Sequence, residues 1–213
     1  MANGFLLGAF DFSTARADEF HDWYDLEHLP ERQRVPGFSA CERWIGIDAP
    51  TAAVAIYDLD SIEVLGSAAY KAIAYENLSP WSKRMVGKAK LLLRFEGVQI
   101  LPGREGAPQN AGAMFLDAMN VVPEAERAFN GWVDNAHIPA VKAVDGVLAA
   151  RRFTSEQEGA GLRRHVAIYH LADPDVLRSP AWKAVFDDAS EAGMRPHIRD
   201  RLQIPTRRYV RQT

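Results

Sequence analysis

The sequence has little of several features that mark particular protein classes. Its single cysteine, Cys41, excludes an internal disulfide framework and is typical of a reducing compartment, so we expect a cytoplasmic protein. Lys and Arg number 25 against 28 Asp and Glu, and a net charge of -3 provides no broad attraction to nucleic acid or to an anionic membrane. The sequence therefore favours a small molecule or another protein as the partner.

Signals for membranes, metals and nucleotides are also missing. The apolar run from Phe5 to Phe10 is short and leads directly into Asp11, so it is neither a secretion signal nor a membrane span. The six histidines lack the paired spacing of a zinc site, and no glycine-rich loop lies between a strand and a helix. We therefore expect no cofactor and no structural metal, although the sequence leaves a single axial haem histidine open.

What the sequence does contain is an internal repeat. Phe20, Trp23, Asp25, His28, Pro30, Gly37, Ala40 and Arg43 recur at a constant offset of 109 residues as Phe129, Trp132, Asp134, His137, Pro139, Gly146, Ala149 and Arg152. After a shift of three residues the match continues, with Val54 to Tyr57 echoed by Val166 to Tyr169. A fixed period of this length indicates a fused duplicate whose copies are each about the size of one small domain.

Hydrophobic periodicity predicts the same order of elements in both copies, namely β, α, β, β, α, β. Strands are expected at residues 5–12, 38–47, 52–59, 91–100, 114–121, 147–154, 163–171 and 205–211. The first helix is expected to begin at Asp18 and to kink or end at His28 because of Pro30, with a second short turn through Glu31 to Arg34. The other helices are expected at residues 61–76, 124–143 and 174–191. We divide the chain into a first ferredoxin-like repeat at 1–101, a linker at 102–112 and a second repeat at 113–213.

Such a unit forms a four-stranded antiparallel sheet with both helices on one face, which leaves the other face uncovered. Two units can bury these faces against each other, and a covalent tandem does so without depending on protein concentration. The sequence therefore predicts an α+β fold in which two ferredoxin-like βαββαβ repeats form an intramolecular eight-stranded barrel with a central cavity. Self-association through the outer helices stays open.

The repeated run resembles a known family. Phe20, Trp23, Tyr24, Asp25, Glu27, His28, Leu29, Pro30, Pro36, Gly37, Phe38 and Arg43 look like the signature of the dimeric α+β barrel proteins, in particular the EthD-like branch. The second copy is similar but has Val133 in place of Tyr24 and Ala136 in place of Glu27. The superfamily includes cofactorless monooxygenases, muconolactone-type isomerases, polyketide cyclases, dehydratases and haem-dependent peroxidases, so the resemblance implies a cavity rather than one reaction.

The candidate catalytic residues are Tyr24, Asp25 and His28. An imidazole exchanges protons near neutral pH, Asp25 could fix its tautomer, and Tyr24 could donate to a developing oxyanion. The alternative is structural, because an Asp and a His beside a Pro can simply secure a helix end. Repetition of the pair as Asp134 and His137 suits that alternative equally well.

The remaining candidates would bind a ligand or stabilise the fold. Arg43 and Arg152 could clamp a ligand carboxylate, but we favour ion pairs with Asp25 and Asp134. Trp23 lies on the apolar stripe of its helix, which favours core packing over a place in a pocket wall. Tyr57 lies on a strand, so the alternation of side chains decides whether its hydroxyl points into the cavity or whether its ring covers the sheet.

Two functions follow from these residues. The first is a cofactor-independent enzyme that acts by acid/base chemistry on a small apolar or aromatic compound, as an isomerase, dehydratase, cyclase or lyase, or as a monooxygenase of the resembling family. The second is a non-catalytic ligand-binding or assembly protein in which the repeated His and Asp are structural. The absence of Tyr24 and Glu27 counterparts in the second copy favours chemistry in the first.

Overall fold

The computed structural model describes residues 3–157, 159 and 161–211. Within this part of the chain eight antiparallel strands close into one barrel in the order β1-β3-β2-β8-β5-β7-β6-β4. The strands are β1 (Gly4–Asp11), β2 (Phe38–Gly46), β3 (Ala52–Leu59), β4 (Lys90–Leu101), β5 (Ala113–Val121), β6 (Val147–Thr154), β7 (His165–Leu171) and β8 (Ile198–Arg208). The expected α+β class with an eight-stranded antiparallel barrel is confirmed.

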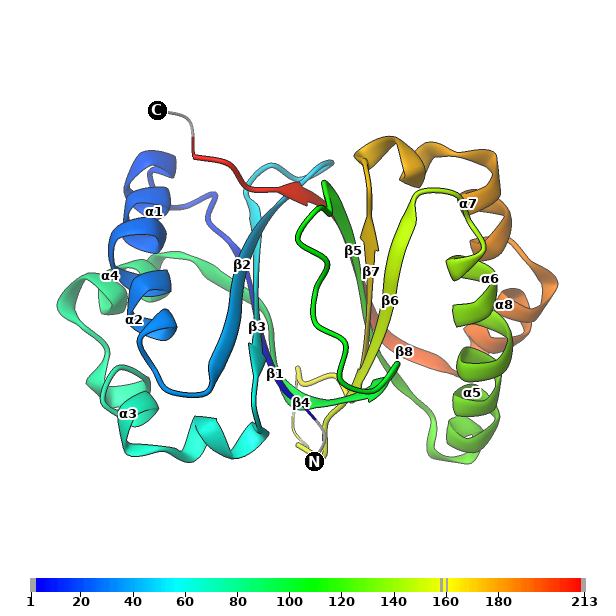
Figure 1. Cartoon of the computed structure of the whole chain (residues 1–213), viewed down its shortest axis with the longest axis horizontal. Coiled ribbons are helices and arrows are strands. Elements are labelled where there is room, and N and C mark those ends of the chain that lie inside the picture. Colours follow the sequence, from blue (N-terminus) through cyan, green and yellow to red (C-terminus); the bar gives the residue numbers. More distant parts are fainter. Residues whose placement is uncertain (1–2, 158, 160, 212–213) are drawn as a thin grey trace.

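Each half of the chain supplies four neighbouring strands and the helices that cover their outer face, as Figure 1 shows. We call residues 3–101 the first half and residues 113–211 the second half. In the first half the helices are α1 (Ala17–Trp23), α2 (Leu29–Gln33), α3 (Ala68–Lys71) and α4 (Pro80–Lys88). In the second half they are α5 (Glu126–Trp132), α6 (Ile138–Lys142), α7 (Pro180–Phe186) and α8 (Ala189–Met194). None of the described helices has the length and apolarity to cross a bilayer.

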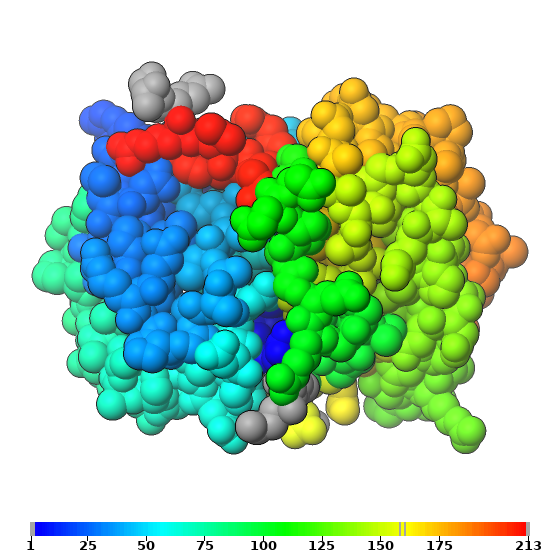
Figure 2. Space-filling model, in the orientation of Figure 1, coloured from blue at the N-terminus to red at the C-terminus, as the bar shows by residue number. Residues whose placement is uncertain are grey.

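The two halves join along short strand contacts. β2 pairs with β8 from Trp44 to Gly46, and β4 pairs with β6 from Val98 to Leu101. The linker at 102–112 contains no helix or strand and lies across the junction between the halves (Figure 2). The exact boundaries of the two repeats, and their origin by duplication, stay an interpretation of the sequence.

The barrel interior is a packed core, so the prediction of a central cavity is wrong. Because side chains alternate along a strand, every second residue points inward. In this chain most inward residues in the middle of the barrel are apolar, and the rings of Phe5 and Phe153, one from each half, stack at a centroid distance of 3.8 Å. The core they belong to includes Leu7, Trp44, Val54, Ile56, Phe95, Met114, Leu116 and Ile168. Among the described residues these side chains pack into one continuous apolar cluster between the sheets.

One end of the barrel interior is polar and is covered by the linker. Arg151 of the second half is completely buried and donates to Asp58 at 2.5 Å and to Gln99 at 2.7 Å, both in the first half. The linker contributes the Ala107 N–H to Asp58, and Gln99 donates to the carbonyl of Glu105. This network therefore ties both halves and the linker together.

The helices after β3 and β7 differ from the predicted ones. Residues 62–77 form a 3₁₀ turn, the short α3 and a second 3₁₀ turn, while α4 lies between the helix expected at 61–76 and the strand expected at 91–100, where no helix was predicted. A new helix begins there because the Ser79 hydroxyl accepts the N–H of Ser82 and Pro80 occupies the first turn. The predicted helix at 174–191 is likewise divided into a 3₁₀ turn, α7 and α8. The last strand begins at residue 198 rather than 205, because its charged first residues hid the strand pattern.

Candidate functional site

A π-helical segment positions the candidate residues. The helix that starts with α1 does not end at Pro30 but passes through a wider π-helical turn at Tyr24–His28 and continues as α2. The Leu29 N–H donates to the Tyr24 carbonyl, five residues back. Pro30 has no N–H and would clash with the carbonyl four residues before it, which the wider turn avoids. The kink expected at Pro30 is therefore this π segment, and the second half repeats it at Val133–His137.

Beneath this segment lies a pocket of about 320 Å³, between the helices and the outer face of the first-half sheet. We call it the first-half pocket. Its volume lies near the lower end of the usual range for small-molecule sites, about 300–1,000 Å³. The apolar part of its wall is formed by Leu6, Gly8, Phe10, Leu78, Val86 and Leu91. The polar part is formed by Tyr24, His28, Arg32, Tyr57, Tyr70, Tyr75 and Arg94.

His28 borders the first-half pocket as a neutral imidazole. Its ring packs against Trp23 at a centroid distance of 4.4 Å and against Tyr24 at 4.9 Å. Its Nδ1 is buried and has no hydrogen-bond partner among the described residues. Burial holds the pKa of His28 well below its usual value, and the cations Arg32, Arg43 and Arg94 add to this effect. The ring is therefore unprotonated at neutral pH and can accept a proton or a hydrogen bond.

Two tyrosine hydroxyls lie beside it. Burial raises the pKa of Tyr24 against the opposing effect of Arg43, and burial raises the pKa of Tyr57 well above its usual value. Both are consequently protonated at neutral pH and able to donate. The Tyr57 hydroxyl is buried and has no hydrogen-bond partner among the described residues. The strand alternation thus places Tyr57 at the pocket on the helix side of the sheet rather than inside the barrel.

Asp25 is turned away from His28. Its carboxylate forms an ion pair with Arg43 and accepts the Tyr209 hydroxyl at 3.0 Å. The Arg43 guanidinium lies 4.0 Å from the centre of the Tyr209 ring. The Asp25–His28 hydrogen bond that the sequence suggested is therefore not formed, whereas the Arg43–Asp25 ion pair is confirmed. Trp23 is buried and donates to the Ser82 hydroxyl at 2.9 Å, which connects α1 to α4.

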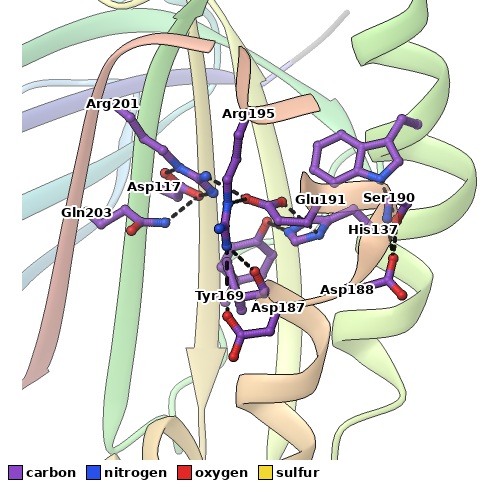
Figure 3. A network of polar contacts seen from close by, with 12 residues as sticks. Asp117, His137, Tyr169, Asp187, Asp188, Ser190, Glu191, Arg195, Arg201 and Gln203 are labelled. Carbon is purple, nitrogen blue, oxygen red and sulfur yellow. Dashed lines mark hydrogen bonds and ion pairs between the residues drawn. The ribbon is translucent and has the colours of Figure 1, made fainter. Parts of the chain in front are cut away.

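The second half uses its histidine differently. His137 Nε2 lies 3.1 Å from the Tyr169 hydroxyl, and its Nδ1 lies 3.8 Å from Glu191 (Figure 3). Burial lowers the pKa of His137 to about 4. The corresponding pocket measures about 20 Å³, which holds about one water molecule. Asp134 pairs with Arg152, as the sequence predicts, so both arginines favoured as ion-pair residues have carboxylate partners.

The second-half pocket is filled by a network of charges that the first half lacks. Asp117 corresponds to Gly8 at the 109-residue offset of the repeat. Arg201 donates to both oxygens of Asp117, at 3.0 and 2.6 Å, and also to Glu191 at 2.6 Å (Figure 3). Gln203 adds a bond to Asp117 at 3.1 Å. The same position in the first half has no side chain, which leaves the first-half pocket open.

Sequence reasoning missed Gly8, Arg32, Tyr70 and Arg94 as pocket residues. The signal for Arg94 was present, because Leu93 and Phe95 face the barrel interior and the residue between them must face the helices. Reading residues 91–100 as one apolar strand concealed this alternation. Gly8 carried no signal, since only the structure shows that a Cβ there would meet nothing closer than the Phe10 ring edge at 3.4 Å.

Buried histidines make the fold sensitive to acid. Burial lowers the pKa of His170 to about 3, with Arg151 and Arg208 adding to it, while His137 and His28 are lowered as described. The unfolded chain binds these protons near pH 6.5 but the folded chain does not, so stability is complete above about pH 7 and falls as pH drops from there towards 4. Each histidine contributes a slope of about 1.4 kcal/mol per pH unit in that window. Urea unfolding at about pH 7.5 and pH 5 should differ by a few kcal/mol; equal stabilities would contradict this burial.

No group of three or more His, Cys, Asp or Glu side chains in the described residues could hold a metal ion. His165 faces the helices, where it contacts Glu126 at 2.8 Å, whereas His170 belongs to the barrel interior. Cys41 is half-buried and burial raises the pKa of its thiol to about 12, so it is a poor nucleophile.

Comparison with known proteins identifies the fold. No family model matches the sequence and no curated protein is similar to it. Solved structures are similar across almost the whole chain. A candidate chlorite dismutase has a TM-score of 0.67 and 13% identity, with 99% of this chain and 96% of that chain covered. A candidate monooxygenase from Lactobacillus acidophilus has a TM-score of 0.56 and 11% identity, and the match covers 98% of this chain and 94% of that chain. A haem-binding protein from Thermus thermophilus has a TM-score of 0.54 and 12% identity, and the match covers 98% of this chain and 92% of that chain. At these identities the likeness shows the fold alone.

Proposed function

We propose that the first-half pocket binds a small, largely apolar compound of one or two rings and that the chain is a cofactor-independent enzyme acting on it by acid/base chemistry. Isomerisation, dehydration, cyclisation and lyase reactions all need a group that moves a proton beside groups that stabilise the resulting oxyanion. The observation that carries the proposal is the difference between the halves. In the second half the histidine is bonded and its pocket is filled, whereas in the first half the histidine is unpaired and its pocket is open.

In this proposal His28 accepts the proton and the tyrosines donate. A neutral imidazole at the pocket wall removes a proton from a carbon or oxygen of the substrate, and the Tyr24 or Tyr57 hydroxyl donates a hydrogen bond to the oxygen that gains charge. Asp25 holds Arg43 and thereby fixes the outer side of the helix that carries His28. The EthD-like resemblance supports the proposal because two residues of that signature, Tyr24 and His28, line the first-half pocket.

One fold neighbour is a haem-binding protein, so the fit of a haem must be considered. A histidine that ligates a metal almost always donates its other ring N–H to an acceptor, and His28 Nδ1 has none among the described residues. The volume of about 320 Å³ suits one or two rings rather than a macrocycle with its side chains. The filled second-half pocket is far smaller still. The residues present do not fit a haem, and we assign no step to one.

A ligand-binding protein without catalysis is the second candidate. The observation that favours it is the structural use of His137, whose bond to Tyr169 shows that this histidine position can serve packing alone. Under this candidate the first-half pocket binds its ligand and releases it unchanged.

The function is tested by closing the first-half pocket. We expect Gly8→Leu to fill it without loss of fold, because the new side chain extends into open space from a strand that already prefers a larger residue. A panel of one- and two-ring phenols, enones and lactones is incubated with the wild type, and products are measured by mass spectrometry. Turnover by the wild type should be lost in Gly8→Leu, while Gly131→Leu on the exposed face of α5 keeps it. Equal turnover by Gly8→Leu and the wild type would place the chemistry elsewhere.

A further inference from the structure

We propose that the ligand of the first-half pocket is an anion: an apolar body of one or two rings that carries one carboxylate, with the carboxylate held by Arg94. This inference rests on the proposed function and specifies its substrate class.

The ionised residues that line the first-half pocket are both arginines. Arg32 and Arg94 reach it, and no Asp or Glu is among its wall residues. Glu31 forms an ion pair with Arg32, and Glu96 forms one with Arg94, but neither glutamate is a wall residue of the pocket. All three charges that act on the His28 ring are cations, namely Arg32, Arg43 and Arg94. The interior of the pocket is therefore electropositive, which favours an anion and disfavours a cation.

The two arginines differ in how accessible their donors are to a ligand. Arg32 is 4% exposed and already donates to the His28 carbonyl, to Glu31 and to the Ile73 carbonyl. Its role is to hold α2 and to contribute positive potential. The Arg94 side chain is 38% exposed, and its Nε and Nη2 donate to Glu96 and to the Tyr70 hydroxyl. The Tyr75 side chain also interacts with this guanidinium, whose central carbon lies 5.7 Å from the centre of the Tyr75 ring. A guanidinium has five N–H groups, so the three bonds to Glu96 and Tyr70 leave the Nη1 donors for Tyr75 and a ligand carboxylate to share.

The second half shows what such a carboxylate would look like. Gly8 is paired across the sheet with Arg94, and Asp117 is paired with Gln203. In the second half the Asp117 carboxylate fills this position and receives two bonds from Arg201 and one from Gln203. The chain thus supplies its own carboxylate to Arg201, which lies two residues along β8 from Gln203, the counterpart of Arg94. In the first half Gly8 supplies none, and the ligand would provide it.

The experiment compares two probes that differ in charge. 2-Naphthoate and its neutral analogue 2-naphthamide have nearly the same shape, and their binding is measured by calorimetry with the full chain. We expect 2-naphthoate to bind at least tenfold more tightly than 2-naphthamide. Arg94→Gln should abolish this preference, whereas Arg94→Lys keeps part of it. Arg84→Gln removes the same charge from an exposed residue of α4 outside the pocket wall and should leave the preference unchanged.

Gly8→Asp tests the same inference by copying the second half. Its new carboxylate should occupy Arg94, so this variant should lose 2-naphthoate binding, while Gly8→Asn loses less. The comparison of the two probes with the wild type requires no variant and decides the question even if Arg94→Gln fails to fold. Equal affinities for the two probes, both lost in Gly8→Leu, would overturn the anion inference and leave the proposed function standing. Absence of binding by 2-naphthoate, or binding that Gly8→Leu does not change, would also overturn it.

Discussion

Arg151→Met is expected to lower the free energy of unfolding by about 3–5 kcal/mol, because it leaves Asp58 as a buried charge without its partner. Arg151 belongs to the second half, while Asp58 and Gln99 belong to the first. The loss therefore measures how firmly the two halves are joined at the polar end of the barrel. Chemical denaturation followed by circular dichroism gives the value.

The matched control is the double variant Arg151→Met with Asp58→Asn. The amide removes the buried charge but keeps an oxygen that accepts the Ala107 N–H of the linker. Since replacing both members of a buried ion pair costs far less than removing one, the double variant should recover most of the lost stability. A loss of less than about 1 kcal/mol in the single variant would mean that Arg151 and Asp58 are solvated and that the halves do not close as described.

His28→Phe and His137→Phe are expected to have opposite effects, although the two histidines occupy equivalent places in the repeat. His137→Phe removes the partner of the buried Tyr169 hydroxyl and should cost about 1–3 kcal/mol of stability. His28→Phe replaces a ring whose buried nitrogen has no partner, and its stability should change by less than about 0.5 kcal/mol. Turnover should fall by about 10²–10⁴-fold in His28→Phe, the usual contribution of a general acid or base.

Thermal and chemical denaturation of both variants, together with turnover of any compound found in the panel, tests this contrast. His197→Phe serves as the control, because His197 lies in a 3₁₀ turn after α8 and outside the wall of the first-half pocket. Equal stability losses in His28→Phe and His137→Phe, with turnover retained in His28→Phe, would indicate that both histidines are structural.

The order of strands and helices could be predicted from the sequence because each element leaves a local pattern of apolar, aromatic and proline residues. Apolar runs of five to nine residues gave most strands, and the repeated Phe, Trp, His and Pro residues gave the first helix of each half. The ion pairs of Arg43 and Arg152 also followed, since a charged residue on a strand facing a helix needs a partner.

The location of the pocket was not readable, because it depends on volume rather than on pattern. The inward residues of the strands could equally have lined a cavity or filled the barrel, and the stacked rings of Phe5 and Phe153 decide for filling. Likewise the sequence places Asp25 within reach of His28 along the helix, but the π turn and Tyr209 from the end of the chain turn its carboxylate towards Arg43. Both the filling of the barrel and the direction of the Asp25 carboxylate depend on contacts between segments far apart in the sequence, which a local pattern does not show.

The most direct test is a crystal structure of the protein soaked with one- and two-ring aromatic fragments. We predict that fragments bind between the helices and the outer face of the first-half sheet, in contact with Tyr24, His28 and Tyr57, and that the barrel interior and the second-half pocket stay filled by side chains. Fragments bound inside the barrel or beside His137, with the first-half pocket closed by its own side chains, would contradict the account.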